Sequence, residues 1–528
     1  MKLSVVGQSL GGYPHTVAFS VDDGVGQLAA EFTTVGYADD VAAPTTAHAS
    51  TSILTESPAN QPSHRFPCFD GLRAAAALAV LVLHTSYWSG FTTHSGIGNY
   101  VGRLEIGVAV FFLISGFLLY RPFALAHLTD RPAPSATRFW YRRLLRLVPA
   151  YWVALTMITY VFRDVTLGHG WQGVVANYGF AQIYFPGQIF NGITQAWSLC
   201  TEMTFYLFVP LYAAAIGLRR RSQSGQLQRE IRGLVVLVAI SFSFRNWALH
   251  QPVSCAPNCF ARPAEVSLMS SWLPSYFDLF ALGMLLAVLS AWYSERGTEP
   301  RFLSHPLFPW LSWAIAAVTY WIVSNIHIGM TPIYYISPSL NLVKQSLYGV
   351  FAFFLILPAV FGPQHQGLIR RLLRARVVVA LGVISYGIYL WHVAWIAEFL
   401  KWTNYRDFRV PYLFMLGSVF GLSIVAATVS YLVFEIPALR MKDRTFRWRR
   451  RPEDPLVASP LLMAPTLAAL EAGSVMGPGK VARLVALSRL HQAGELTDTE
   501  FELLKAEVIN APEPSAELSP QRQLGRGD

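Results

Sequence analysis

The sequence predicts an all-α, polytopic membrane protein, and three observations lead to that fold class. Charged residues make up only 14% of the 528 residues, against about 25% in a typical soluble protein. Hydrophobic residues account for 53% of the chain, and the mean hydropathy is +0.37. Long apolar runs follow one another from Leu72 to Phe434. This composition excludes a disordered polymer and a small disulfide-stapled protein, and it argues against a wholly soluble enzyme.

Ten of these apolar runs predict transmembrane helices, since a membrane-spanning helix needs about 17–25 such residues. In chain order they are Leu72–Gly90, Leu104–Tyr120, Leu147–Phe162, Ala196–Gly217, Gly233–Leu249, Trp272–Ala291, Leu307–Ser324, Asn341–Phe361, Val377–Leu400 and Tyr412–Phe434. The third run is short and partly aromatic, and the fifth contains Arg245 and Asn246 near its end.

The positive charges between these runs predict the orientation of the chain. Alternate connecting segments are basic, namely Arg121–Arg146, Arg219–Arg232, Arg296–Arg301, Arg370–Arg376 and the stretch Arg440–Arg451. The segments in between carry fewer cations, and Ile326–Leu340 has no charged residue. Because basic loops stay on the cytosolic side, we expect both termini in the cytosol. The basic loops that set this orientation then account for the net charge of +10, and binding to nucleic acid is not needed to explain it.

The two ends of the chain differ in composition from the membrane domain, which we place at residues 64–440. Residues 1–63 are polar and predict a disordered cytosolic tail, because the apolar start at Met1 is too short for a signal peptide. A linker is expected at 441–475, a helical hairpin at 476–512 and a disordered tail at 513–528.

The hairpin is predicted from helical spacing and capping signals. Apolar residues at Val481, Leu484, Leu487 and Leu490 lie on one helical face that ends at Gly494. Thr497–Glu500 forms a capping box that opens a second helix with Phe501, Leu504 and Val508 on one face. The segment resembles the short C-terminal (SHOCT) module of bacterial proteins, which implies self-association or docking.

The four cysteines carry no clear chemistry. Cys68 and Cys200 are far apart in the sequence and suggest no metal site. Cys255 and Cys259 fall in one outer loop. The sequence is compatible with a disulfide between them and with two free thiols.

The first predicted span contains two ionisable residues on one face. His84 follows Arg73 by eleven residues, which raises it by roughly 16 Å and returns it to within ~20° of the same azimuth. A histidine near mid-bilayer is costly unless it faces protein or water. A hydrogen bond between helices would explain a lone histidine, but the face shared with Arg73 favours a functional site.

A basic cluster precedes the third span. Arg143 and Arg146 are three residues apart, so they project together from a helix, and Arg142 lies close by. One or two arginines would be explained by the positive charge that sets the membrane topology of the chain. Because guanidinium groups bind phosphate in bidentate fashion, the cluster favours a phosphate-bearing cytosolic ligand.

Further polar residues extend this pattern towards the outer face. Glu202 lies a few residues inside the fourth span, and Tyr389 and His392 lie in the ninth. Glu435 is interpreted as a structural ion-pair partner of the arginines, and Asp70 as a structural partner of Arg73. Together the residues predict a water-accessible tunnel with arginines at its cytosolic end and His84 midway. Phosphate binding beside a base with a pKa near 7 suits transfer from a coenzyme A thioester to a hydroxyl.

Seven motifs in chain order make the sequence similar to the membrane acyltransferase-3 family of bacterial O-acyltransferases, over roughly Phe69 to Pro437. They are Phe69-Asp70-Gly71-Leu72-Arg73 with His84, Gly107–Phe117, Arg142–Trp152, Trp197-Ser198-Leu199 with Glu202, Phe280-Ala281-Leu282-Gly283, Ser385–His392 and Glu435-Ile436-Pro437.

The resemblance implies roles for several of these residues. Arg73 and His84 match the family's Arg-x10-His pair, and Arg143 and Arg146 match its RxxR motif. By analogy, acetyl-CoA or a related short acyl-CoA enters from the cytosol with its phosphates on the arginines. The chain departs from the family pattern at Ala109, where many relatives have an acidic residue. Any role of that carboxylate is therefore absent here or is taken over by Glu105.

The sequence therefore predicts an O-acyltransferase of the bacterial inner membrane that uses acyl-CoA and no metal. His84, Arg73 and Glu202 are the expected catalytic residues, with His84 as general base or as a covalent acyl carrier. Arg142, Arg143, Arg146, Tyr389 and His392 are expected to bind the acyl-CoA. The acceptor would be a glycan or glycolipid. A transporter or flippase is the alternative function, although the sequence lacks the repeats and broken helices that would support it, and a degenerate sensor is a third.

Overall fold

The fold was analysed in a computed structural model. It describes residues 66–129, 131–168, 170–218, 222–251, 268–297, 299–326, 337–441, 487–488, 491 and 498–510. Within these ranges all regular structure is helical and no strand occurs. The tail predicted for residues 1–63, most of the linker and the final tail lie outside the described residues, as do Cys255 and Cys259.

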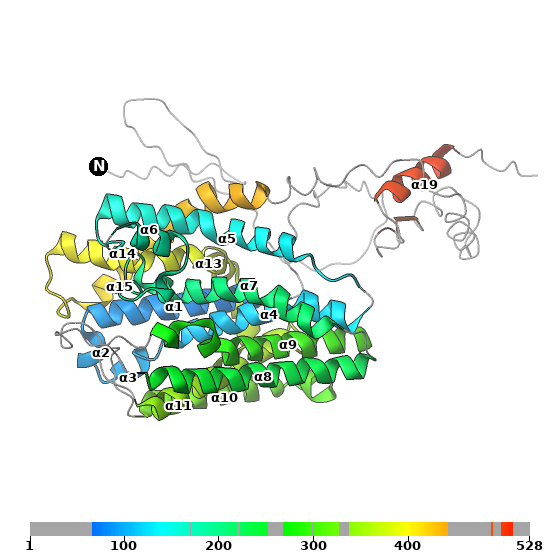
Figure 1. The fold of residues 1–528 in the computed structure, drawn as a ribbon, viewed down its shortest axis with the longest axis horizontal. Helices are drawn as coiled ribbons and strands as arrows, with labels where there is room; N and C mark the ends of the chain where they lie inside the picture. The colour runs from blue at the N-terminus through cyan, green and yellow to red at the C-terminus, as the bar shows by residue number, and fades with distance from the viewer. Residues whose placement is uncertain are drawn as a thin grey trace, which may run out of the picture. The chain divides into compact units, whose positions relative to one another are not determined.

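Long helices running side by side form the membrane domain (Figure 1). Their bounds are α1 Phe69–Trp88, α4 Ile106–Leu128, α5 Ala136–Thr156, α7 Trp197–Gly217, α8 Gln223–Leu249, α9 Phe277–Arg296, α10 Phe308–Asn325, α11 Pro338–Val360, α13 Arg376–Val383, α14 Ser385–Thr403 and α15 Tyr412–Ser430. Helix α5 continues into the π-helical turn η2, Met157–Phe162, and α15 into η8, Tyr431–Glu435.

Among the described residues, eight helices are long and apolar enough to cross a membrane, or nine if a bent pair counts as one span. This confirms a polytopic membrane protein. The bent pair is α13 and α14, which meet at 70°, so the predicted span Val377–Leu400 is broken in the middle. The predicted span Leu307–Ser324 forms α10, whose 18 residues are not among the eight.

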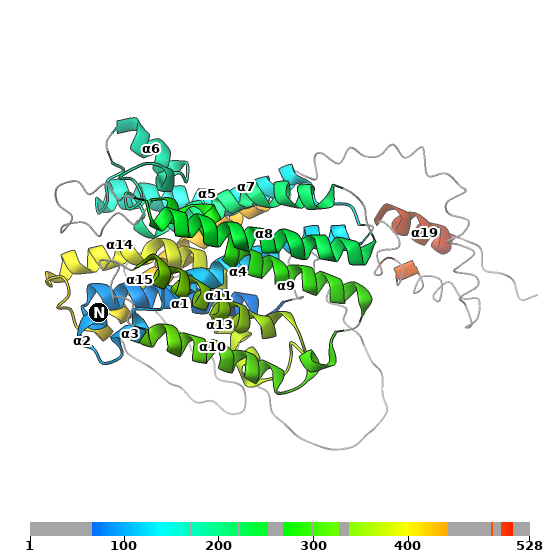
Figure 2. The ribbon, with the colours of Figure 1, turned by 60° about the horizontal axis from the view of Figure 1, so that its bottom comes forward.

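Short helices connect the long ones. They are α2 Phe91–His94, α3 Gly98–Val101, α6 Gly170–Tyr178, η3 Gln182–Tyr184, η4 Thr194–Ala196, η5 Leu268–Ser271, η6 Leu273–Tyr276, η7 Arg301–Ser304 and α12 Leu368–Leu373. Figure 2 shows α2, α3 and α6 at one end of the bundle. We call the other end, where α1 and α5 begin and α4 and α7 end, the basic end, because the arginine-rich connecting segments lie there.

Helices α4 and α9 pack most extensively and form the centre of the core. Their contact is close because each helix has a glycine at the crossing. A Cβ atom on Gly116 would lie 2.3 Å from the carbonyl oxygen of Phe280, and one on Gly283 would lie 2.1 Å from that of Leu113. The sequence motifs Gly107–Phe117 and Phe280–Gly283 are therefore the two halves of one helix–helix contact.

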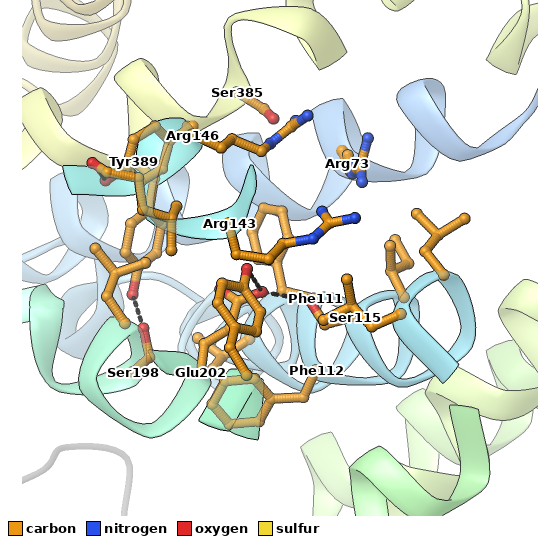
Figure 3. A pocket seen from close by; sticks show the side chains of 18 residues that line it. Arg73, Phe111, Phe112, Ser115, Arg143, Arg146, Ser198, Glu202, Ser385 and Tyr389 are labelled. Atoms are coloured by element: carbon orange, nitrogen blue, oxygen red, sulfur yellow. Dashed lines mark hydrogen bonds between the residues drawn. The ribbon is translucent and has the colours of Figure 1, made fainter. Parts of the chain in front are cut away.

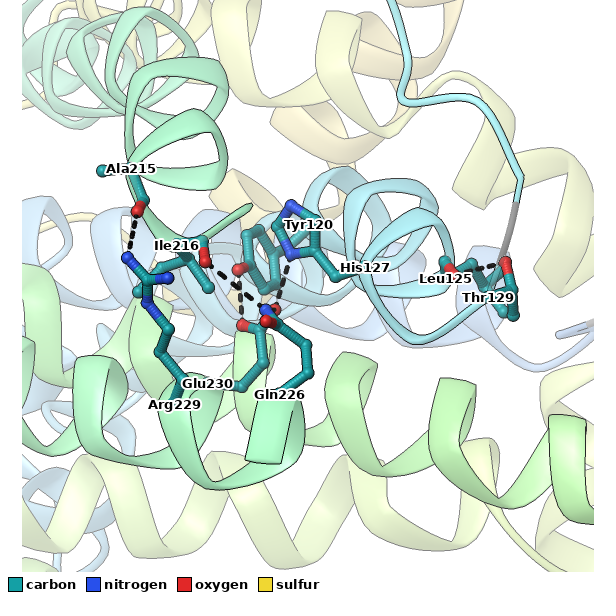
Figure 4. A network of polar contacts seen from close by, with 9 residues as sticks. All are labelled: Tyr120, Leu125, His127, Thr129, Ala215, Ile216, Gln226, Arg229 and Glu230. Carbon is teal, nitrogen blue, oxygen red and sulfur yellow. Dashed lines mark hydrogen bonds and ion pairs between the residues drawn. The ribbon is translucent and has the colours of Figure 1, made fainter. Parts of the chain in front are cut away.

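A buried carboxylate joins α4 to α8 near the basic end (Figure 4). Glu230 is fully buried and accepts 2.6 Å hydrogen bonds from the Tyr120 hydroxyl and from Nδ1 of His127. Gln226 completes the group through a 3.4 Å hydrogen bond to Glu230. Buried charges are tolerated when they are paired in this way.

The described part of the predicted hairpin comprises a helical turn at Leu487 and helix α19, Asp498–Asn510. The rings of His491 and Phe501 stack with centroids 4.5 Å apart, and Leu487 and Leu504 are buried. The two segments therefore touch, and the hairpin at 476–512 stays a prediction. The resemblance to the SHOCT module stays a prediction.

The two cysteines in the described residues, Cys68 and Cys200, are buried free thiols. Cys68 precedes α1, and burial raises the pKa of its thiol. A raised pKa disfavours the thiolate, which is the reactive form of cysteine.

Candidate active site

One pocket in the membrane domain brings together residues from α1, α4, α5, α7 and α14 (Figure 3). It has about 800 Å³ of empty space, its opening included. Its polar lining consists of Arg73, Ser115, Arg143, Arg146, Ser198, Glu202, Tyr206, Ser385, Tyr386 and Tyr389. Phe111, Phe112 and several aliphatic side chains form the rest of the wall.

Three of the predicted arginines converge on this pocket. Arg143 and Arg146 reach it from α5, because the helix begins at Ala136 and so includes both residues one turn apart. Arg73 reaches it from α1 and pairs with Asp70 at 3.1 Å, the structural role predicted for Asp70.

The other two arginines form no ion pair within the described part of the chain. Neither Arg143 nor Arg146 forms an ion pair with any described residue, and the Arg143 guanidinium lies 5.7 Å from the centre of the Phe139 ring. Within the described residues the pocket therefore contains three guanidinium groups and one carboxylate, Glu202, and this excess of positive charge is the pattern of an anion-binding site.

The single carboxylate of the pocket lies among hydroxyl groups. Glu202 Oε1 accepts a 2.8 Å hydrogen bond from Tyr206, one turn along α7, and a second from Ser115 on α4. Figure 3 shows the labelled side chains of Glu202 and Ser115 below Arg143. The structure thus places Glu202 in the same pocket as the arginines.

His84 lies outside the lining of this pocket and contacts another histidine. Its Nδ1 atom is 2.8 Å from Nε2 of His392, and the two rings stack with centroids 5.0 Å apart. Ala77 and Val80 lie on the same face of α1 as Arg73 and His84, and they are 1% and 2% exposed. This face is therefore covered by protein at Ala77 and Val80, and His84 at its far end is half-buried.

Tyr389 lies between the pocket and the histidine pair. Its ring is 6.1 Å from that of Phe111 on the pocket wall and 5.8 Å from that of His392. Its hydroxyl group is held by Ser198 at 2.7 Å and by the carbonyl oxygen of Gln195 at 2.9 Å. The lining of the pocket thus ends at Tyr389, and the continuous tunnel expected to reach His84 is not formed by this pocket.

Three other residues from the sequence analysis lie away from the pocket. Arg142 does not line it. Glu435 is 5% exposed and forms no close ion pair with a described arginine, although Arg146 of the cluster lies near enough to act on it electrostatically. Glu105 instead accepts hydrogen bonds from Lys344 at 2.7 Å and Tyr348 at 2.8 Å.

Sequence reasoning missed two hydroxyl groups of the site. Tyr206 follows Glu202 by four residues, so helical spacing could have indicated their contact. Ser115 is 87 positions away in the sequence, and only the packing of α4 against α7 brings it to Glu202. Among the described residues, no group of three or more His, Cys, Asp or Glu side chains could hold a metal ion.

Comparison with known proteins shows which family the chain belongs to. A family model described as an acyltransferase domain matches residues 66–433. The acyltransferase MdmB of Streptomyces mycarofaciens is 28% identical over 340 residues, which cover 62% of this chain and 78% of MdmB. No solved structure matches the chain.

Two further relatives are named as putative O-acetyltransferases. A putative O-acetyltransferase of Staphylococcus aureus (strain COL) is 23% identical, over 72% of this chain and 59% of the relative. The putative peptidoglycan O-acetyltransferase YrhL of Bacillus subtilis (strain 168) is 26% identical, over 73% and 57%. The chain thus spans less than two thirds of the length of these two relatives. Together with the membrane helices, the family match shows that the chain belongs to the acyltransferase-3 family of membrane enzymes that transfer acyl groups.

Proposed function

We propose that this protein transfers an acetyl or other short acyl group from acyl-CoA to a hydroxyl of a cell-envelope glycan or glycolipid. The observation that carries the proposal is the convergence of Arg73, Arg143 and Arg146 on one pocket, where the latter two form no ion pair with a carboxylate of the described residues. Coenzyme A has several phosphate groups, and unpaired guanidinium groups bind phosphate strongly.

The proposal includes an orientation in the membrane. Basic connecting segments favour the cytosolic side, so the basic end faces the cytosol of the bacterial inner membrane, and both termini lie there. Arg143 and Arg146 lie in the third and fourth turns of α5, which places their side chains within reach of a ligand that enters from the cytosol. The C-terminal hairpin would serve in self-association.

His84 is the proposed base for the acceptor hydroxyl, or the residue that carries the acyl group covalently. Because the pocket ends at Tyr389, the acyl end of the donor must pass this side chain to reach His84. Replacing His84 by Ala should lower acyl transfer about 10²–10⁴-fold if the imidazole is the base. Near-normal transfer by this variant would exclude His84 from the reaction.

The donor site can be tested with coenzyme A alone. We expect purified protein in nanodiscs to bind CoA, and Arg143→Gln or Arg146→Gln to weaken binding by about 10- to 100-fold each, because each removes a charge-assisted contact. Arg138→Gln is the matched control, since Arg138 is an exposed residue of the same helix that does not line the pocket. Equal CoA binding by the double variant and the native protein would refute the donor site.

The acceptor can be identified by mass spectrometry of envelope glycans and lipids from cells with and without the gene. The mass difference of the modified species distinguishes acetyl from succinyl. A modified species that depends on the gene, and on Arg143, is the expected result.

A further inference from the structure

We infer that His392 positions His84 by fixing its tautomer, so that Nε2 of His84 presents a free lone pair to the substrate. This inference rests on the proposed function, because it concerns the base of the same reaction. It assigns His392 a role different from the CoA binding expected from the sequence, and His392 does not line the arginine pocket.

The direction of the hydrogen bonds follows from a backbone carbonyl. Nδ1 of His392 lies 3.1 Å from the carbonyl oxygen of Ile388, one turn earlier on α14. A carbonyl oxygen only accepts hydrogen bonds, so Nδ1 of His392 carries a proton.

The second nitrogen of His392 then acts as an acceptor. His392 is completely buried, and no acidic side chain of the described residues contacts it. An imidazolium at this position would be a buried charge without a counterion, which is strongly unfavourable. His392 is therefore neutral, and Nε2 carries the lone pair.

This arrangement determines the proton on His84. Nδ1 of His84, 2.8 Å away, must donate to Nε2 of His392. In the neutral His84 ring the remaining nitrogen, Nε2, then carries the lone pair. A fixed partner at one ring nitrogen is a general way to set the tautomer of a catalytic histidine.

The partner is held rigidly enough to act in this way. Its neighbours Ile388 and Leu390 are fully buried, and a Cβ atom on Gly387 would lie 2.7 Å from the backbone of Ala427 on α15. Helix α14 is thus packed tightly against α15 on the turn that precedes His392. His84, by contrast, is half-buried and so has a surface that a substrate can reach.

With this tautomer, every proton and electron pair of the transfer reaction is accounted for. The acceptor hydroxyl gives its proton to Nε2 of His84 while its oxygen forms a bond to the thioester carbonyl carbon. The carbon–sulfur bond breaks, its electron pair goes to the sulfur of CoA, and the thiolate takes the proton back from Nε2. His84 ends the cycle with Nδ1 protonated, as it began.

The tautomer can be measured without any turnover. In ¹⁵N-histidine-labelled native protein in lipid, solid-state NMR distinguishes protonated from unprotonated ring nitrogens. The signals of His84 are those lost in His84→Ala. We expect a protonated Nδ1 and an unprotonated Nε2, and the reverse pattern would overturn the inference.

Kinetics of CoA release from acetyl-CoA then separates positioning from binding. His392→Leu removes the acceptor and should lower kcat about 10- to 100-fold without changing the KM for acetyl-CoA. His392→Gln keeps an oxygen acceptor near the same position and should restore much of the rate. A raised KM with unchanged kcat, or equal losses in both variants, would contradict the inference.

The two proposals fail in different ways. Native protein that neither binds CoA nor releases it from acetyl-CoA would refute the proposed function, while the NMR pattern still tests the histidine pair. Activity that depends on His84 but is unaffected by His392→Leu would refute the positioning role alone.

Discussion

The Tyr206 hydroxyl donates a 2.8 Å hydrogen bond to Oε1 of Glu202, one helical turn earlier on α7. Ser115 donates to the same oxygen from α4. The only carboxylate among the pocket-lining residues is thereby held in place by hydroxyl groups rather than by the arginines that share the pocket. Its negative charge opposes the binding of an anionic donor, so its presence calls for a role other than donor binding.

We therefore expect Glu202→Gln to separate binding from catalysis. Removing the charge should tighten CoA binding by about three- to tenfold, while acyl transfer falls if Glu202 acts on the substrate. Titration calorimetry with CoA and a transfer assay measure the two effects. Tyr206→Phe keeps the charge and should leave CoA binding nearly unchanged. Weaker CoA binding by Glu202→Gln would show that the carboxylate supports the donor site.

The α4–α9 contact should be sensitive to a single methyl group. Gly283→Ala would bring a Cβ atom to 2.1 Å from a backbone carbonyl oxygen, so the helices must separate, at a cost of about 1–3 kcal/mol or more. We expect a lower thermal unfolding temperature in detergent. Gly417→Ala and Gly421→Ala on α15 are the controls, since nothing lies within 4 Å of either added atom. Equal stability of Gly283→Ala and these controls would contradict the close packing.

Arg370 should be essential for the segment between α11 and α12. Its side chain is 2% exposed and donates to the carbonyl oxygens of Pro358, Phe361 and Pro363 at 2.8–3.1 Å. Arg370→Gln should destabilise the protein by about 2–5 kcal/mol, because buried acceptors lose charge-assisted hydrogen bonds. Arg371→Gln, at the exposed neighbouring position, should unfold at the native temperature. If the two variants unfold at the same temperature, the hydrogen bonds of Arg370 contribute no stability.

The Glu230 cluster in Figure 4 should also be structural. Glu230→Ala leaves Tyr120 and His127 without their acceptor, and the loss of one partner of a buried pair costs about 3–5 kcal/mol. The control is Glu295→Ala, which removes a partly exposed ion pair with Arg131 at 3.6 Å, worth about 0–1 kcal/mol. Thermal unfolding of both variants, followed by tryptophan fluorescence, measures the difference. A small effect at Glu230 would mean that water replaces the lost carboxylate.

The sequence predicted the helices of the membrane domain well, and it placed several of their ends less well. Helix α5 begins at Ala136, eleven residues before the predicted start at Leu147, because the basic residues Arg138–Arg146 continue the helix beyond the apolar run. The break between α13 and α14 has no proline to indicate it. It occurs where a Cβ atom on Gly382 would lie 2.0 Å from the carbonyl oxygen of Asp70, so contact with α1 accompanies the bend.

Apolar length, basic connecting segments and the spacing of Arg73, His84, Arg143 and Arg146 determined the fold class and the first candidates for the site. These properties are local, since hydropathy and helical periodicity act within about twenty residues of the chain. The sequence could not decide which polar groups meet across helices. Packing alone joined Glu202 to Ser115 and His84 to His392, 308 positions apart. It also inserted Tyr389 between the arginines and the histidines, because the distances between helices depend on the fit of all their side chains at once.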